Sequence, residues 1–113
     1  MAIFRRRKPD ALQGTLDLLV LKILSRGPHH GYGIAADITA ISDDLLRVEE
    51  GSLYPALHRM EHLGWIVADW QTTANNRRAR VYRLTRAGDR QLAQQRDKWA
   101  RVTKGVAKVL RFA

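Results

Sequence analysis

The fold is decided by residues 51–84, GSLYPALHRMEHLGWIVADWQTTANNRRARVYRL. As far as His62, the apolar residues of this stretch recur every three or four positions, which is the spacing of one face of a helix. Residues 65–72 and 80–84 are instead strand-like, rich in aromatic and β-branched side chains, and they flank a turn-forming segment at 73–76. We therefore predict a helix that is followed directly by a β-hairpin.

Three further helices are predicted on either side of that stretch. Residues 10–25 are apolar nearly all round and end at the breaker Arg26-Gly27-Pro28. A second helix is predicted over residues 31–41, and a long one from Thr85 to about Leu110. The apolar character of the first helix on more than one side indicates that it is buried on both sides, with its second side against another subunit.

Three helices, a two-stranded hairpin and a final helix make up the winged helix-turn-helix arrangement, in which the second helix of the motif enters the major groove of DNA. The predicted fold class is therefore mainly α with a small β-hairpin and a long C-terminal helix. We divide the chain into a basic N-terminal arm over residues 1–9, a DNA-binding domain over 10–84 and a dimerisation helix over 85–113.

Length and composition restrict the class of protein. A chain of 113 residues is one domain with appendages, and its 45% hydrophobic content argues against disorder. The sequence contains no cysteine, which excludes disulfides, thiolate metal sites and cysteine nucleophiles. The longest apolar stretch, residues 16–24, is too short to cross a bilayer, and the first ten residues show no secretory signal. We expect a cytoplasmic protein without a membrane partner.

The net charge of +9 is unevenly distributed along the chain. Residues 1–8 hold four basic and no acidic side chains, residues 9–70 four basic and nine acidic ones, and residues 71–113 twelve basic and two acidic ones. This asymmetry favours a polyanionic partner over the simpler alternative of a solvated surface. The basic residues 5–8 are either a DNA-contacting arm or a frayed tail.

The helix over residues 51–62 and the hairpin tip carry the candidate DNA contacts. The N-terminal half of a recognition helix meets base edges and phosphates. On this helix Arg59 is suited to a guanine edge, Ser52 and Tyr54 to phosphates, and Pro55 to a thymine methyl group. At the hairpin tip, arginines suit phosphates and narrow minor grooves, whereas the two asparagines are also ordinary turn formers. The candidates are Ser52, Tyr54, Pro55, His58, Arg59, Asn75, Asn76, Arg77, Arg78 and Arg80.

The same helix contains a rival pattern. His58-Arg59-Met60-Glu61-His62 fits H-x-x-E-H, in which two histidines bind zinc and the glutamate acts as base. Such a site needs a third protein ligand, commonly a carboxylate, and no glutamate follows Glu61 in the sequence. We therefore expect no metal site, no cofactor and no enzymatic activity.

Four segments together resemble the PadR family of bacterial transcription regulators: GTLDLL at 14–19, GYGI at 31–34, GSLYPALHRME at 51–61 and YRLT at 82–85. The resemblance covers about residues 11–90. It points to the small branch of the family, which has a single helix after the wing. It implies a homodimeric DNA-binding regulator, usually a repressor, with Tyr32 and Tyr54 near the DNA backbone. A core position for Tyr32 remains the alternative.

The last helix has a heptad pattern that suits pairing with another helix. Leu92, Trp99 and Val106 occupy one heptad position, and the other is apolar except at Gln95. With the first helix, this pattern predicts a homodimer independently of the family. The candidate interface residues are Leu16, Leu19, Ile23, Leu92, Trp99, Val102, Val106 and Val109.

Trp99 has two interpretations. An aromatic residue at helical spacing is usually part of a core. It also resembles the tryptophan on which some multidrug-sensing members of the small PadR branch stack planar aromatic compounds, which implies an effector site. Thr103 stands one turn further on, so a cationic ligand would lack a counter-charge there.

We therefore predict a sequence-specific, homodimeric transcriptional repressor that is relieved by a small planar aromatic effector. Its two recognition helices would enter successive major grooves of a pseudo-palindromic operator about 34 Å apart. The alternative is a winged-helix protein-interaction module without DNA specificity.

Overall fold

The computed structural model describes residues 11–113, so the arm predicted over residues 1–9 lies outside the described residues. The four helices and the hairpin of the described chain follow the predicted order, and the mainly helical fold with a long last helix is confirmed. They are α1 (Ala11–Leu24), β1 (His29–His30), α2 (Gly31–Ile41), α3 (Glu50–His62), β2 (Ile66–Thr72), β3 (Arg78–Leu84) and α4 (Arg86–Leu110).

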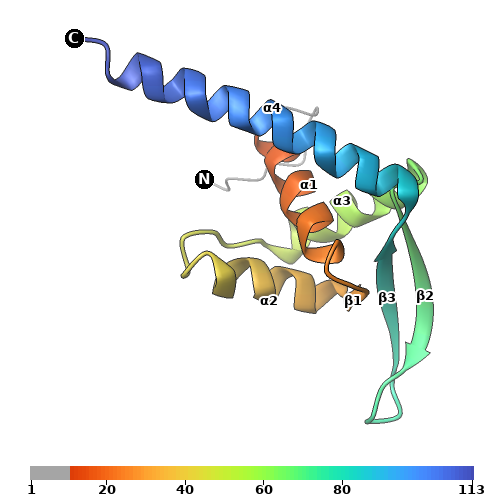
Figure 1. The fold of residues 1–113 in the computed structure, drawn as a ribbon. Helices are drawn as coiled ribbons and strands as arrows, with labels where there is room; N and C mark the ends of the chain where they lie inside the picture. Colours follow the sequence, from red (N-terminus) through yellow and green to blue (C-terminus); the bar gives the residue numbers. More distant parts are fainter. Residues whose placement is uncertain (1–10) are drawn as a thin grey trace.

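Helix α1 lies at the centre of the domain, between α4 on one side and α2 and α3 on the other (Figure 1). It packs against α2, α3, α4 and β3, which explains why its apolar residues cover more than one side. Leu16 is only 2% exposed and Leu92 of α4 only 5%, and both belong to the core of the chain itself. The prediction that these two leucines face another subunit was therefore wrong, because α4 of the same chain covers this side of α1.

The sheet has three antiparallel strands in the order β1-β3-β2. The hairpin pairs Ile66 with Leu84 at its base and Thr72 with Arg78 at its outer end, so β3 begins two residues earlier than predicted. Asn76 has a φ of 59°, which supports its expected role in the turn. The two-residue strand β1 was not predicted, because two histidines show neither strand periodicity nor strand-forming residue types.

The junction between α3, β2 and α4 is held by Thr85, the N-cap of α4. Its hydroxyl accepts a hydrogen bond from the Gly88 amide at 3.0 Å and lies 2.7 Å from the Gly64 carbonyl and 2.9 Å from that of Trp65. Gly88 must lack a side chain, because a Cβ there would overlap the Trp65 carbonyl oxygen. The start of α4 is therefore fixed against the residues that join α3 to β2.

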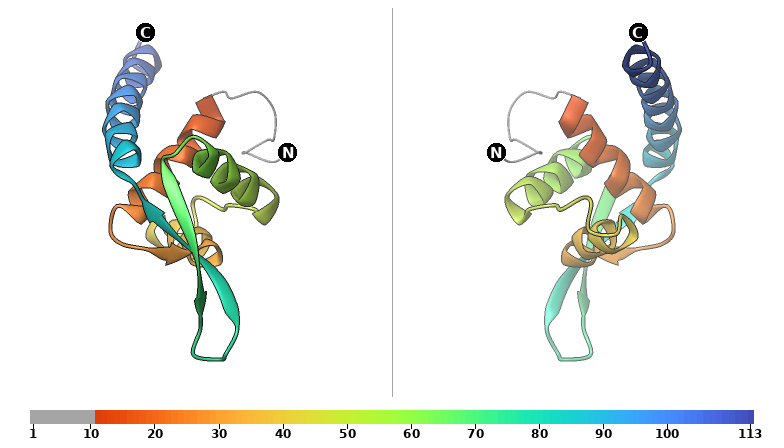
Figure 2. Two further views of the ribbon diagram at one scale, coloured as in Figure 1. Left: turned by 90° about the vertical axis from the view of Figure 1, so that its right-hand side faces the viewer. Right: turned by 90° about the vertical axis from the view of Figure 1, so that its left-hand side faces the viewer.

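From this junction α4 runs past α1 and its second half extends away from the rest of the domain, at the end opposite the hairpin (Figures 1 and 2). The apolar side chains of that half are exposed, and Val109 is 74% accessible. None of the helices in residues 11–113 combines the length and hydropathy that a membrane span requires.

Candidate nucleic-acid interface

Helix α3 presents a polar and aromatic surface opposite its buried stripe. Leu53, Leu57 and Met60 are fully buried and hold the helix against the core. On its other side Tyr54 and His58 are exposed, and the predicted contact residues Ser52 and Pro55 are half-buried. The polar and aromatic side of α3 therefore faces away from the core.

The start of α2 lies beside that surface. The Tyr54 ring packs against Gly31, where an added Cβ would lie 3.0 Å from the nearest ring carbon, so a larger residue at the start of α2 would require the ring to shift. Tyr32 is 65% exposed and stacks on the ring of His30, with the ring centroids 5.5 Å apart. The alternative of a core position for Tyr32 is therefore wrong, and both tyrosines belong to one surface.

Arg59 does not belong to that surface. Its Nη2 donates a hydrogen bond to Oδ1 of Asp17 on α1 at 2.5 Å, and the Asp17 side chain is only 6% exposed. The assignment of Arg59 to a guanine edge is thus corrected, because its guanidinium is turned inward to a buried carboxylate. Burial raises the pKa of Asp17, and the bond from Arg59 offsets only part of this effect.

A sequence signal for this pair existed. Asp17 lies inside the apolar stretch at 16–24, and a carboxylate on a helix that is buried all round needs a partner. Its partner is 42 residues away, so helical periodicity alone cannot identify it.

Arg80 also has a role inside the protein. Its Nη2 donates a hydrogen bond to Oε2 of Glu61 on α3 at 2.8 Å, and both side chains are partly buried. Its assignment to the DNA-contacting tip is therefore corrected to a link between the hairpin and α3.

Glu61, the base of the zinc-peptidase pattern, is thus held in an ion pair with Arg80. Among the described residues no three histidine, aspartate or glutamate side chains are grouped so that they could hold a metal ion.

The remaining residues that were predicted to contact DNA from the hairpin lie at its tip. Asn75, Asn76, Arg77 and Arg78 are all exposed there, on the part of the hairpin that projects furthest from the domain (Figure 2). The tip is closed by the Thr73 amide, which donates to the Arg77 carbonyl at 2.7 Å. The side chains of Arg77 and Arg78 make no ion pair within residues 11–113.

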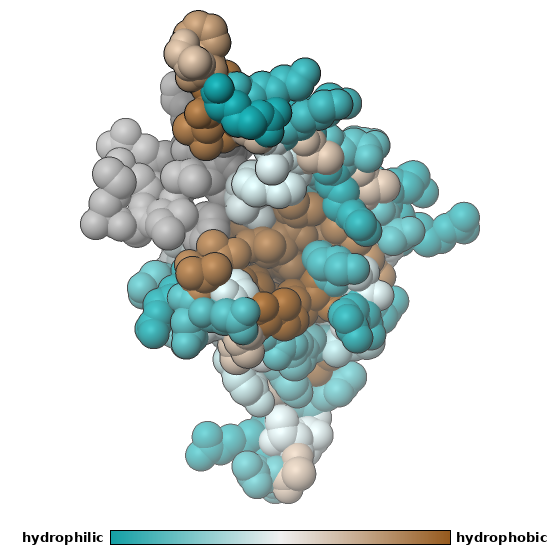
Figure 3. Space-filling view, turned by 60° about the vertical axis from the view of Figure 1, so that its left-hand side comes forward, coloured by the Kyte–Doolittle hydropathy of each residue, from teal (hydrophilic) through white to brown (hydrophobic). Residues whose placement is uncertain are grey.

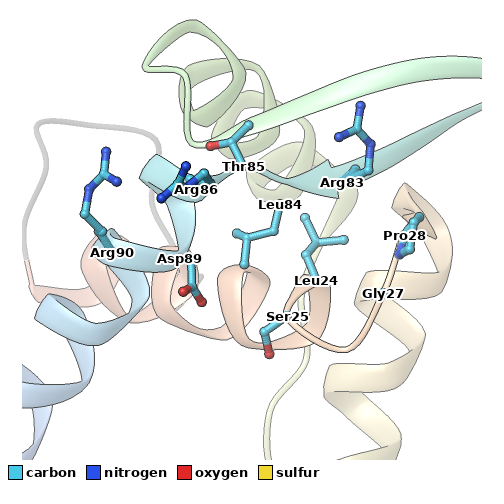
Figure 4. A pocket seen from close by; sticks show the side chains of 10 residues that line it. All are labelled: Leu24, Ser25, Gly27, Pro28, Arg83, Leu84, Thr85, Arg86, Asp89 and Arg90. Atoms are coloured by element: carbon cyan, nitrogen blue, oxygen red, sulfur yellow. The ribbon is translucent and has the colours of Figure 1, made fainter.

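A cavity of about 600 Å³ lies elsewhere, where the end of α1, the end of β3 and the start of α4 meet (Figure 4). Leu24 and Leu84 form its apolar centre. The guanidinium groups of Arg83 and Arg90 extend in the opposite direction from the Asp89 carboxylate (Figure 4). Because these polar groups do not converge, the cavity lacks the arrangement that a catalytic site requires.

The comparisons with known proteins agree with this geometry. Residues 20–94, from α1 into α4, match the family described as the transcriptional regulator PadR-like family. The chain belongs to this family. Members of the PadR-like family regulate transcription, so the protein is a transcriptional regulator rather than an enzyme.

Similar structures support the same assignment. A transcriptional regulator from Clostridium thermocellum is 29% identical, with a TM-score of 0.80 over 88% of this chain and 97% of the other. A PadR family regulator from Eggerthella lenta is 31% identical, with a TM-score of 0.75 over 89% and 86% of the two chains. A transcriptional regulator from Mycobacterium tuberculosis is 46% identical over 50 residues, which is 44% of this chain and 46% of that protein.

The Asp17–Arg59 pair generates a stability prediction. We expect Arg59→Ala to lower the free energy of unfolding at pH 7 by about 2–4 kcal/mol, because a buried charge that loses its partner is strongly destabilising. Since the pKa of Asp17 is raised in the folded state, the folded protein protonates Asp17 at a higher pH than the unfolded chain does. The loss should therefore shrink as the pH falls from 7 towards 4, as measured by urea unfolding.

The control removes the titrating carboxylate. In an Asp17→Asn background, adding Arg59→Ala should give a loss that does not depend on pH in this range. An Arg59→Ala loss of equal size at pH 7 and pH 4 in the Asp17 background would contradict the assignment.

Proposed function

We propose that this PadR-like regulator is a homodimeric repressor that binds a pseudo-palindromic DNA operator. The observation that carries the proposal is the division of the arginines on α3 and the hairpin. Arg59, Arg80 and Arg83 each pair with a carboxylate, whereas Arg77 and Arg78, at the exposed tip of the hairpin, pair with none in the described chain. Unpaired guanidinium groups on a projecting hairpin are suited to phosphates, as on the wing of a winged helix.

Helix α3 would then provide the sequence-specific contacts. With Arg59 turned inward, base contacts would fall to Ser52 near the N-terminus of α3 and to His58 about two turns further on, and Tyr54 and Tyr32 would lie against the DNA backbone. In a two-fold dimer the two α3 helices would enter successive major grooves about 34 Å apart. Occupancy of such a site near a promoter would block polymerase.

The alternative, a winged-helix protein-interaction module without DNA specificity, makes a different prediction for the DNA upstream of the protein's own gene. A mobility shift on that DNA, compared with a scrambled fragment of equal length, separates the two. Equal shifts on both fragments would favour the alternative.

The hairpin tip generates a prediction about salt dependence. Arg77→Ala should weaken binding to operator and scrambled DNA alike, and should reduce the slope of log K against log salt by about 1, because one phosphate contact is lost. The measurement is fluorescence anisotropy with labelled duplexes at several salt concentrations. Arg83→Ala is the matched control, since Arg83 lies at the base of the hairpin and its Nη2 is 3.7 Å from Oδ2 of Asp69. Equal slopes for Arg77→Ala and the wild type would contradict the contact.

The dimer is supported by apolar surface that the single chain leaves uncovered. Figure 3 shows a hydrophobic area in the middle of one face of the molecule and another at its top. Leu19 and Ile23 on α1 are half-buried and border a recess of about 190 Å³ between α1 and α2. The second half of α4 adds a row of exposed apolar side chains. This row consists of Trp99, Val102, Val106 and Val109.

Contact between these surfaces of two protomers would bury the row, as in a paired helix with a heptad seam.

We expect Val106→Asp to convert the dimer to a monomer in sedimentation velocity at micromolar concentration, because it places a charge in the seam. Gln94→Asp is the control: it adds the same charge at an exposed position of α4 outside the seam. A Val106→Asp protein that sediments as a dimer would argue against α4 as the interface.

The proposed relief by an aromatic effector rests on Trp99. Its side chain is 48% exposed and borders a recess of only about 60 Å³, shared with Leu18 and Val102. A cavity that holds benzene measures about 150 Å³, so a planar ligand on Trp99 would need the α4 helix of a partner to enclose it.

The effector site predicts a difference between tryptophans. A neutral planar compound such as acridone should quench the emission of the wild type and of Trp70→Phe, because both retain Trp99 as a stacking surface. Trp99→Phe should lose this quenching. Equal quenching of Trp99→Phe and the wild type would exclude stacking at this position.

A further inference from the structure

Trp70 is a large aromatic side chain in an unusual place. It lies on β2 towards the outer end of the hairpin and is 58% exposed. Its ring packs neither into the core nor against the seam of α4. A tryptophan that stays in contact with water on a projecting hairpin gains little from burial, so its role must come from the side chains around it.

Two arginines of the neighbouring strand lie over its ring. Arg80 is the cross-strand partner of Trp70, and its guanidinium carbon lies 5.7 Å from the ring centroid. The guanidinium carbon of Arg78 lies at 4.9 Å. Residues two apart on a strand share a face, so Arg78, Arg80 and Trp70 form one row along the hairpin. Both distances are within the range of cation–π attraction.

The row continues to the recognition helix. Arg80 also donates its hydrogen bond to Glu61 on α3, and its guanidinium carbon lies 5.8 Å from the buried ring of Tyr82. The sequence of contacts is therefore Glu61, Arg80, Trp70 and Arg78, from α3 out to the tip. It joins the two elements that would contact DNA.

The two arginines of the row differ in the charge and the N–H donors that remain available to a ligand. The positive charge of Arg80 is balanced by the Glu61 carboxylate, which also reduces its repulsion of Arg78. Arg78 is held by an aromatic face, which attracts the cation without occupying its N–H donors. Its guanidinium is thus held in place while its hydrogen-bonding edges remain available to a phosphate or to the minor groove.

We propose that Trp70 is a positioning residue of the wing: it holds Arg78 in a conformation ready for DNA and, through Arg80 and Glu61, couples the wing to α3. This inference rests on the DNA-binding function proposed above. It distinguishes Arg78 from its neighbour Arg77, which makes no cation–π contact with the row in the described chain.

The test is a pair of double-mutant cycles measured by anisotropy on one operator duplex. We expect Arg78→Ala to weaken binding about tenfold and Trp70→Ala about threefold, with Trp70→Phe close to the wild type because a second aromatic ring keeps the attraction. Adding Trp70→Ala to Arg78→Ala should cost nothing further. Adding Trp70→Ala to Arg77→Ala should cost the same threefold as in the wild type.

A general loosening of the hairpin would give a different result, because Trp70→Ala would then couple equally to Arg77 and Arg78. That outcome would overturn the proposal, as would an unchanged affinity of Trp70→Ala while Arg78→Ala is weakened. In that second case the DNA-binding function stands. A wild-type protein that binds no DNA overturns both. Thermal unfolding of each variant checks folding, and the exposure of Trp70 predicts nearly unchanged midpoints.

Discussion

The arrangement of the domain depends on one buried ion pair, Asp17–Arg59. A buried carboxylate on α1 would be costly by itself. The raised pKa of Asp17 indicates that burial has a larger effect on this carboxyl than the hydrogen bond and charge of Arg59. The pair nevertheless requires a particular orientation of its two side chains, whereas contacts between leucines do not. Together with the buried Leu53, Leu57 and Met60, it fixes which side of α3 faces the core, and the side that carries Tyr54 and His58 therefore faces outward.

The arginines of α3 and the hairpin have two different uses, and the difference is set by whether a carboxylate is near. Arg59 and Arg80 neutralise Asp17 and Glu61 and connect α3 to α1 and to the hairpin. Arg77 and Arg78 lie beyond the reach of the acidic residues that the core region carries. The net charge of +9 therefore overstates the surface available to a polyanion, because part of it is used to hold the domain together.

The local elements could be predicted from the sequence because their signals are local. The helix at Gly31–Ile41, the hairpin and the helix that ends at Leu110 were placed within two residues of their observed bounds by periodicity and turn residues. The side-chain partners could not be predicted in the same way. Asp17 meets Arg59 across 42 residues and Arg80 meets Glu61 across 19, and the packing of α1 against α4 decides that Leu16 is internal. These distances in sequence carry no periodic signal.

The fixed start of α4 has a consequence for any regulation of the proposed dimer. Thr85 and Gly88 attach α4 to residues 64–65, the link that joins α3 to β2, so α3 and the hairpin share one attachment to α4. The contacts from Glu61 to Arg80 connect these two elements again nearer to the tip. A change in how two α4 helices cross would therefore move α3 and the hairpin together as one body. Regulation through Trp99 would then act on the spacing between two intact DNA-contacting units, and it would not require either unit to change its internal structure.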